Sequence, residues 1–140
     1  MLKKNKKIPI LEKLVMFGLI FILLLHLISI NFYLYWHYWW FDIVMHLLGG
    51  MWAALVTIWF FNSFSFYKDL SFRQRIIFIL ACVLSIAILW EIFEIIIGYV
   101  NPSIGFEYYI DTVFDILFGV LGGFFIAIFS SDIIEINEEK

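Results

Sequence analysis

Residues 41–61 read FDIVMHLLGGMWAALVTIWFF, an unbroken apolar run in which Asp42 and His46 are the sole ionisable side chains. The run does not alternate between apolar and polar residues, so it predicts a helix rather than a strand. At about 1.5 Å per residue, such a helix crosses a hydrocarbon core of about 30 Å. Similar runs occupy residues 14–32, 76–99 and 109–129. The sequence therefore predicts an all-α integral membrane bundle of four transmembrane helices, a single domain over residues 1–140.

The composition supports a protein that sits in the lipid bilayer. Hydrophobic residues make up 64% of the chain, against roughly 45–50% in soluble domains, and the mean hydropathy is +1.00. The net charge is only -3, so no polybasic surface indicates nucleic acid as a partner. The single cysteine, Cys82, excludes an internal disulfide and a cysteine metal cluster.

The distribution of Lys and Arg sets the expected orientation. Lys and Arg gather in residues 3–13 and 68–75, whereas residues 33–40 and 100–108 contain neither. Because cytoplasmic segments carry the excess of Lys and Arg, we expect both termini in the cytoplasm of a multi-pass plasma-membrane protein. The aromatic segment YLYWHYWW, residues 33–40, then lies at the outer interface, where Trp and Tyr are enriched.

Ionisable side chains lie inside the predicted spans, where each costs about 2.5–3.5 kcal/mol near the bilayer centre. Most form pairs three or four residues apart, so each pair shares a helix face. The pairs are Asp42 and His46, Glu91 and Glu94, and Asp111 and Asp115, and His26 is an isolated further group. With the expected orientation, all of them fall in the outer half of the bilayer. They predict one polar pocket that opens to the outside.

The carboxylates of this pocket have no basic partner, because no Lys or Arg lies within any predicted span. Ionised carboxylates cannot share a site of low dielectric constant without compensation. Protons, a metal ion or the cationic part of a ligand would have to neutralise them. For Asp42 and Asp111, capping of a helix start is an open alternative, since carboxylates are favoured there.

Small residues continue the polar faces of the predicted helices. Gly119 and Gly123 follow Asp115 with G-x-x-x-G spacing, which permits close approach of two helices. This spacing fits packing within the bundle, and it fits a homodimer equally well.

Two kinds of chemistry fit the predicted pocket. Paired carboxylates inside a four-helix bundle are how di-metal proteins hold their ions, and a bound divalent ion activates water or holds a phosphate. The candidate metal ligands are Asp42, His46, Glu91, Glu94, Asp111 and Asp115. The candidate catalytic groups, which could also act as acid and base without a metal, are His46, Glu91 and Asp115. The sequence contains no serine–histidine–acid arrangement and no phosphate-cradling loop that would specify a reaction.

Three short motifs carry a family resemblance. They are D-x-x-x-H-x-x-G-G from Asp42, W-E-x-x-E from Trp90 and D-T-x-x-D from Asp111. Their order and spacing resemble the VanZ-like membrane proteins and the YjdF-type inner-membrane proteins. The resemblance implies a small multi-pass membrane protein in which His46, Glu91 and Asp115 are site residues. The paired acids look more like the YjdF type, a family of unknown function, so the resemblance implies no substrate.

We therefore expect a multi-pass membrane protein that binds or acts on a cell-envelope molecule, such as an envelope lipid or a glycan precursor, with or without a divalent metal ion. The alternative is a protein that transports or binds protons or cations without catalysis. The nearly apolar inner halves of the spans weigh against a continuous pathway. Whether the chain is an enzyme stays open.

Overall fold

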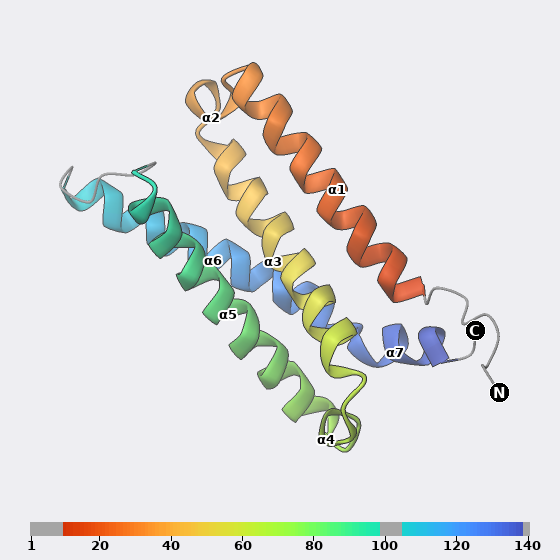
Figure 1. Ribbon diagram of the computed structural model, residues 1–140. Helices are drawn as coiled ribbons and strands as arrows, with labels where there is room; N and C mark the ends of the chain where they lie inside the picture. Colours follow the sequence, from red (N-terminus) through yellow and green to blue (C-terminus); the bar gives the residue numbers. More distant parts are fainter. Residues whose placement is uncertain (1–9, 99–104, 139–140) are drawn as a thin grey trace.

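The structure, a computed structural model, describes residues 10–98 and 105–138, which form helices and no strand (Figure 1). The long helices are α1 (Ile10–Asn31), α3 (Trp40–Phe61), α5 (Phe72–Ile96) and α6 (Phe106–Ile128). The short ones are α2 (Leu34–His37), α4 (Ser65–Lys68) and α7 (Ser130–Glu138). All four long helices are long and apolar enough to cross a membrane. This confirms the predicted all-α bundle of four spans.

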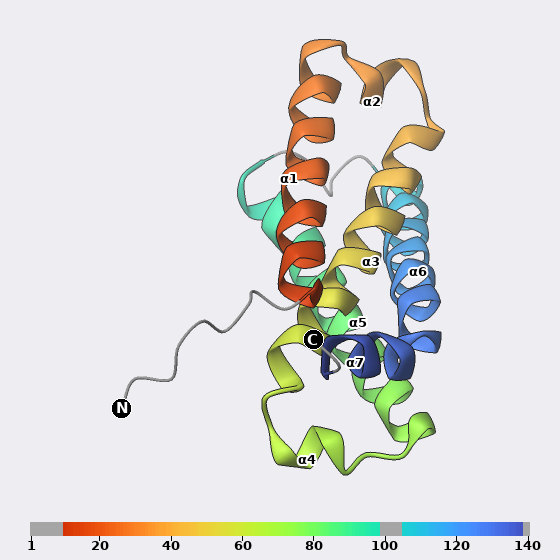
Figure 2. The ribbon, with the colours of Figure 1, turned by 90° about the vertical axis from the view of Figure 1, so that its right-hand side faces the viewer.

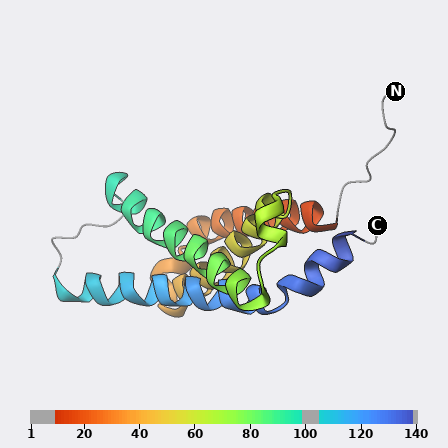
Figure 3. The same ribbon diagram turned by 90° about the horizontal axis from the view of Figure 1, so that it is seen from below.

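The central helix of the bundle is α3, which packs against α1, α5 and α6. Seen from below, α1 and α6 lie on opposite sides of α3 (Figure 3). The start of α1, α4 and α7 lie toward one end of the bundle, called here the α4 end (Figures 1 and 2). The opposite end carries α2 and is called the α2 end. An even number of spans explains why α1 begins and α6 ends on the same side.

The apolar core lies toward the α4 end. Its buried side chains come from the first half of α1 and α5 and from the last half of α3 and α6: Leu11, Val15, Ala53, Ala54, Ile58, Ile79, Val83 and Ala127. Large apolar side chains elsewhere on the long helices are mostly exposed, as expected for surfaces that face lipid rather than water. The buried apolar core thus fills the half of the bundle toward the α4 end, and the polar residues of the spans lie in the half toward the α2 end.

The α4 end is closed by a mixture of apolar and polar contacts. Helix α7 follows α6 after a bend at Phe129 and contacts α1, α5 and α6 (Figures 1 and 3). The Arg75 guanidinium donates to Ser131 Oγ at 3.4 Å and lies 5.7 Å from the centre of the Tyr67 ring. Burial raises the pKa of the Tyr67 hydroxyl to about 12, so this group stays protonated at neutral pH.

Glycines let α3 and α6 touch backbone to backbone. A Cβ atom added to Gly50 would overlap the carbonyl of Gly119, and one added to Gly122 would overlap the carbonyl of Leu47. Gly123 in turn faces the Val83 side chain of α5. The G-x-x-x-G face is therefore buried within the chain, and a homodimer would need a different surface.

The boundaries of the third span differ from the predicted residues 76–99. Helix α5 starts earlier, at Phe72, because Ser71 and Gln74 form a capping box in which the Ser71 backbone N–H donates to Gln74 Oε1 at 2.9 Å. It ends at Ile96, since Gly98 adopts a left-handed conformation with φ of 73°, as is common just after a helix. Tyr99, the last residue of the predicted span, lies outside the described residues.

Candidate functional site

A cavity of about 650 Å³ lies between the helices in the half of the bundle toward the α2 end. Side chains of α1, α2, α3, α5 and α6 line it. Each of the seven ionisable residues expected in the polar pocket contributes to this lining: His26, Asp42, His46, Glu91, Glu94, Asp111 and Asp115. No Lys or Arg of the described residues lines the cavity. Residues far apart in sequence thus form one acidic site.

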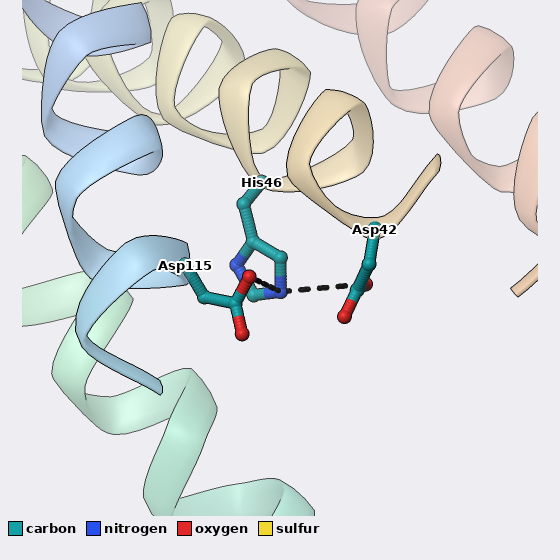
Figure 4. A group of neighbouring side chains, drawn as sticks. All are labelled: Asp42, His46 and Asp115. Carbon is teal, nitrogen blue, oxygen red and sulfur yellow. Dashed lines mark ion pairs between the residues drawn. The ribbon is translucent and has the colours of Figure 1, made fainter. Parts of the chain in front are cut away.

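The centre of the site is the His46 imidazole, which projects from α3 toward α6 (Figure 4). Its Nε2 atom lies 3.6 Å from Asp42 Oδ1 and 3.8 Å from Asp115 Oδ1. Asp42 stands one turn before His46 on α3, and Asp115 comes from α6, so the close glycine contact between these helices brings the three together. One potential ligand atom from each residue lies within 4.8 Å of the others.

Glu91 approaches the opposite side of the imidazole from α5. Its Oε1 atom lies 4.0 Å from His46 Nδ1. This distance is longer than a hydrogen bond, so the contact does not fix the tautomer of the ring. Glu91 therefore lies beside the Nδ1 atom of His46, whereas Asp42 and Asp115 lie beside the Nε2 atom.

The exposed fraction of the side chain differs between the residues of the cluster. The side chains of Asp115 and Glu91 are 6% and 9% exposed, and that of His46 is 11% exposed, whereas that of Asp42 is 41% exposed. The described residues offer no hydrogen-bond donor to the Asp115 carboxylate. Water or a ligand can therefore reach the cluster from the Asp42 side.

Glu94 and Asp111 stand apart from the central cluster. The Trp90 indole N–H donates to Glu94 Oε1 at 3.0 Å, so this carboxylate already has a partner on its own helix. Asp111 is exposed, and it lies five residues beyond Phe106, where α6 starts. That depth excludes the capping role considered for Asp111. Asp42 makes no side-chain cap bond, because the N-cap of α3 is Trp39, but it lies in the first turn of α3, where the helix dipole favours a carboxylate.

Several aromatic residues of the site were not predicted from the sequence. Tyr35 belongs to the aromatic segment expected at the outer interface, yet it lines the cavity, and its hydroxyl lies 2.8 Å from His26 Nδ1. Trp52 also lines the cavity, while its indole N–H donates to the Val15 carbonyl of α1 at 2.9 Å. The sequence gives no signal for these contacts, since they depend on how α1 and α2 fold against α3.

Asp42 and Asp115 offer two carboxylate oxygens, and His46 offers one imidazole nitrogen, to the same part of the cavity. Three protein ligands with an open position are typical of metal sites that bind a further molecule. Mixed oxygen and nitrogen ligands suit Zn, Mn or Fe better than a purely oxygen-binding ion. The donor set thus fits a divalent ion, which would also neutralise the acids.

Comparison with known proteins identifies a family without assigning an activity. No curated protein matches the chain, and neither does any solved structure. One family matches residues 1–134, nearly the whole chain, and its description names a membrane protein, in agreement with the four spans. The chain therefore belongs to the family described as "Predicted membrane protein (DUF2238)".

Proposed function

We propose that this protein binds a divalent metal ion through Asp42, His46 and Asp115 and uses it to bind or act on a cell-envelope molecule. The convergence of the three ligand atoms within 4.8 Å is the observation that carries the proposal. Helices α3 and α6, which supply these atoms, pack backbone to backbone where Gly50 contacts Gly119. Such preorganisation is what a metal site needs in order to select its geometry.

Further features support this assignment. Glu91 adds a further carboxylate 4.0 Å from the second ring nitrogen of His46, which increases the negative charge that a cation at the cluster would offset. The motifs around Asp42, Trp90 and Asp111 resemble those of VanZ-like and YjdF-type proteins, and the histidine, glutamate and aspartate that recur in VanZ-like proteins would correspond to His46, Glu91 and Asp115. A metal with an open coordination position can hold or polarise a phosphate or carbonyl oxygen.

Metal analysis of the purified protein tests the proposal. We expect about one Mn²⁺ or Zn²⁺ per wild-type chain after loading and desalting, and loss of that ion in His46→Gln. The matched control is His37→Gln, because His37 is exposed on α2 and its Nδ1 lies 2.9 Å from the Tyr33 carbonyl, away from the cluster. A wild-type chain that retains neither ion, or a His46→Gln chain that retains it fully, would contradict the metal site.

We further propose that the α2 end faces the outside and that both termini lie in the cytoplasm of a plasma-membrane protein. The basic residues near positions 3–13 and 68–75 support this orientation. In a Cys82→Ala background, an impermeant maleimide should label Trp39→Cys in intact cells. It should label Asp69→Cys only after permeabilisation. The reverse pattern would place the cavity on the cytoplasmic side.

Handling of protons or cations is the alternative function, and the acids of the cavity, which have no Lys or Arg beside them among the described residues, favour it over other non-catalytic roles. The buried apolar core toward the α4 end, with Ala54, Ile58 and Ile79 at its centre, weighs against a continuous pathway. Proton movement by metal-free protein in liposomes would favour this alternative over the metal site.

A further inference from the structure

The negative charge of the cavity exceeds what the proposed metal ion would offset. No Lys or Arg of the described residues lines the cavity, whereas five carboxylates do: Asp42, Glu91, Glu94, Asp111 and Asp115. A divalent ion at the cluster would offset two of these charges and leave three. Ionised carboxylates cannot share a site of low dielectric constant without compensation. The rest of the cavity therefore favours a further positive charge and disfavours an anionic ligand.

Asp115 is a buried member of this lining that has no hydrogen-bond partner. Its side chain is only 6% exposed, it lines the cavity, and the described residues supply no donor to it. Its contact with His46 Nε2, at 3.8 Å, is longer than a hydrogen bond. A buried carboxylate in this state costs free energy unless an ion or a ligand completes its coordination. A metal ion at one carboxylate oxygen leaves the other oxygen able to accept from a cationic ligand.

Apolar and aromatic side chains are interleaved with the acids along the same helices. On α5, Ile86 and Trp90 line the cavity together with Glu91 and Glu94. The Trp90 indole N–H donates to Glu94 Oε1 at 3.0 Å, so an aromatic ring lies directly beside a carboxylate. Aromatic rings attract organic cations through their faces. A ligand that fills the cavity must therefore carry its positive charge within an apolar body.

The cavity opens to the bilayer between α1 and α5. Leu19, Leu23, Ile86 and Trp90 line it, and they are also exposed at the surface of the bundle. Helix α1 packs mainly against α3, whereas α5 packs against α3 and α6, and α1 and α5 do not form a packed pair in the described residues. Because both helices are membrane spans, a molecule dissolved in the membrane can reach the cavity through this opening. This route favours a lipophilic cation over a water-soluble polyamine.

We propose that the cavity binds a lipophilic organic cation, such as an amine or quaternary ammonium group within an apolar or aromatic body. This inference rests on the proposed function for the place of the metal ion, and it names the class of molecule that shares the cavity with that ion. It applies to the metal-free protein as well, because the carboxylates then lack even the ion as compensation. The volume of about 650 Å³ lies within the usual range of ligand pockets, about 300–1,000 Å³.

Glu94→Gln removes one charge from the cavity and leaves the metal ligands in place. Glu94 lines the cavity but is not part of the Asp42, His46 and Asp115 group, and glutamine keeps an oxygen for the Trp90 N–H. Asp69→Asn is the matched control, because it removes one charge from an exposed residue that follows α4 and lies outside the cavity.

Gly49→Leu fills the cavity without changing its charge. Gly49 lines the cavity, and a Cβ atom added to it meets no other atom within 4 Å, so the leucine side chain should occupy space that the ligand needs. Ala81→Leu is the matched control, since it adds bulk to an exposed position of α5 outside the cavity.

Equilibrium binding of tetraphenylphosphonium and tetraphenylborate to the full-length protein in maltoside micelles tests the inference, because the two ions share a shape and differ in the sign of their charge. Partition into protein-free micelles is subtracted for each ion. We expect wild type to bind the phosphonium at least ~10-fold more tightly than the borate, with and without Mn²⁺. We expect Glu94→Gln and Gly49→Leu to bind the phosphonium at least ~5-fold more weakly than their controls.

Three results would overturn the inference. Equal or tighter binding of the borate would show that the carboxylates are neutralised without a cationic ligand. Tighter binding of spermine than of the phosphonium would replace the lipophilic cation with a water-soluble polyamine. Wild-type affinity for the phosphonium in both Glu94→Gln and Gly49→Leu would place the bound cation outside the cavity.

Mn²⁺ content measured on the same samples separates this inference from the proposed function. A wild-type protein that retains no Mn²⁺ but prefers the phosphonium contradicts the metal site and supports the cation. Retained Mn²⁺ without a preference for the phosphonium contradicts the cation alone. Thermal unfolding of each variant shows whether a loss of binding reflects the changed cavity or a damaged fold, and the inference requires weaker binding in a cavity variant that unfolds like wild type.

Discussion

Gly50→Ala is expected to lower the free energy of unfolding by about 2 kcal/mol or more, because overpacking a tight contact forces backbone shifts. The added Cβ atom would overlap the backbone carbonyl of Gly119 on α6, and a backbone atom cannot move aside as a flexible side chain can. The same shift would separate His46 from Asp115. This single methyl group should therefore weaken both the bundle and the site.

The neighbouring glycine provides the control for this prediction. Gly49→Ala meets no atom within 4 Å, and alanine in a helix is favoured over glycine by about 0.5 kcal/mol or more. We expect its stability to equal or exceed that of wild type. Thermal or denaturant unfolding in micelles, followed by circular dichroism, measures both variants. Equal stability of Gly50→Ala and Gly49→Ala would show that α3 and α6 do not meet through Gly50.

Asp115→Asn is expected to weaken Mn²⁺ or Zn²⁺ binding by at least about 100-fold. Changes behind a metal ligand already cost about 10–100-fold in affinity, and this substitution removes a charged ligand oxygen. The side chain is nearly the same size, and it lies in a cavity, so packing should change little. The loss should therefore appear in metal affinity rather than in stability.

Asp111→Asn is the matched control, because it removes the same charge one turn earlier on α6. Asp111 lines the cavity but is exposed and is not part of the Asp42, His46 and Asp115 group. We expect a much smaller loss of metal affinity than in Asp115→Asn, because Asp111 supplies no ligand atom to the cluster. Equilibrium dialysis against a buffered metal solution measures the dissociation constant of the metal for each variant. Similar losses in the two variants would mean that total acidity, rather than a defined ligand set, holds the ion.

The spans were predictable because membrane helices obey one dominant constraint. A helix must cover about 30 Å of hydrocarbon with apolar side chains, so run length alone located α1, α3, α5 and α6. The residues at which the helices begin and end were harder to predict, since local hydrogen bonds and backbone conformation determine them. The capping box at Ser71 added a polar turn to α5, and the left-handed Gly98 ended it before residue 99.

The site was predictable to the extent that helix periodicity governs it. Four-residue spacing places Asp42 beside His46 on one helix face. Which acids of the other helices meet His46 depends on helix rotation, which spacing alone does not determine. The structure brings Asp115 and Glu91 to His46, whereas Trp90 binds Glu94 and Asp111 remains exposed. The apolar opening between α1 and α5 likewise depends on tertiary packing and leaves no pattern in the sequence.

Pulsed EPR of Mn²⁺-loaded protein with ¹⁵N-labelled histidine tests the central claim most directly, because it detects an imidazole nitrogen bound to the ion. We predict a ¹⁵N coupling in the wild-type protein and in His37→Gln, and its loss in His46→Gln. Bound Mn²⁺ with no ¹⁵N coupling in the wild-type protein, or a coupling that persists in His46→Gln, would contradict a metal ion held by His46 between Asp42 and Asp115.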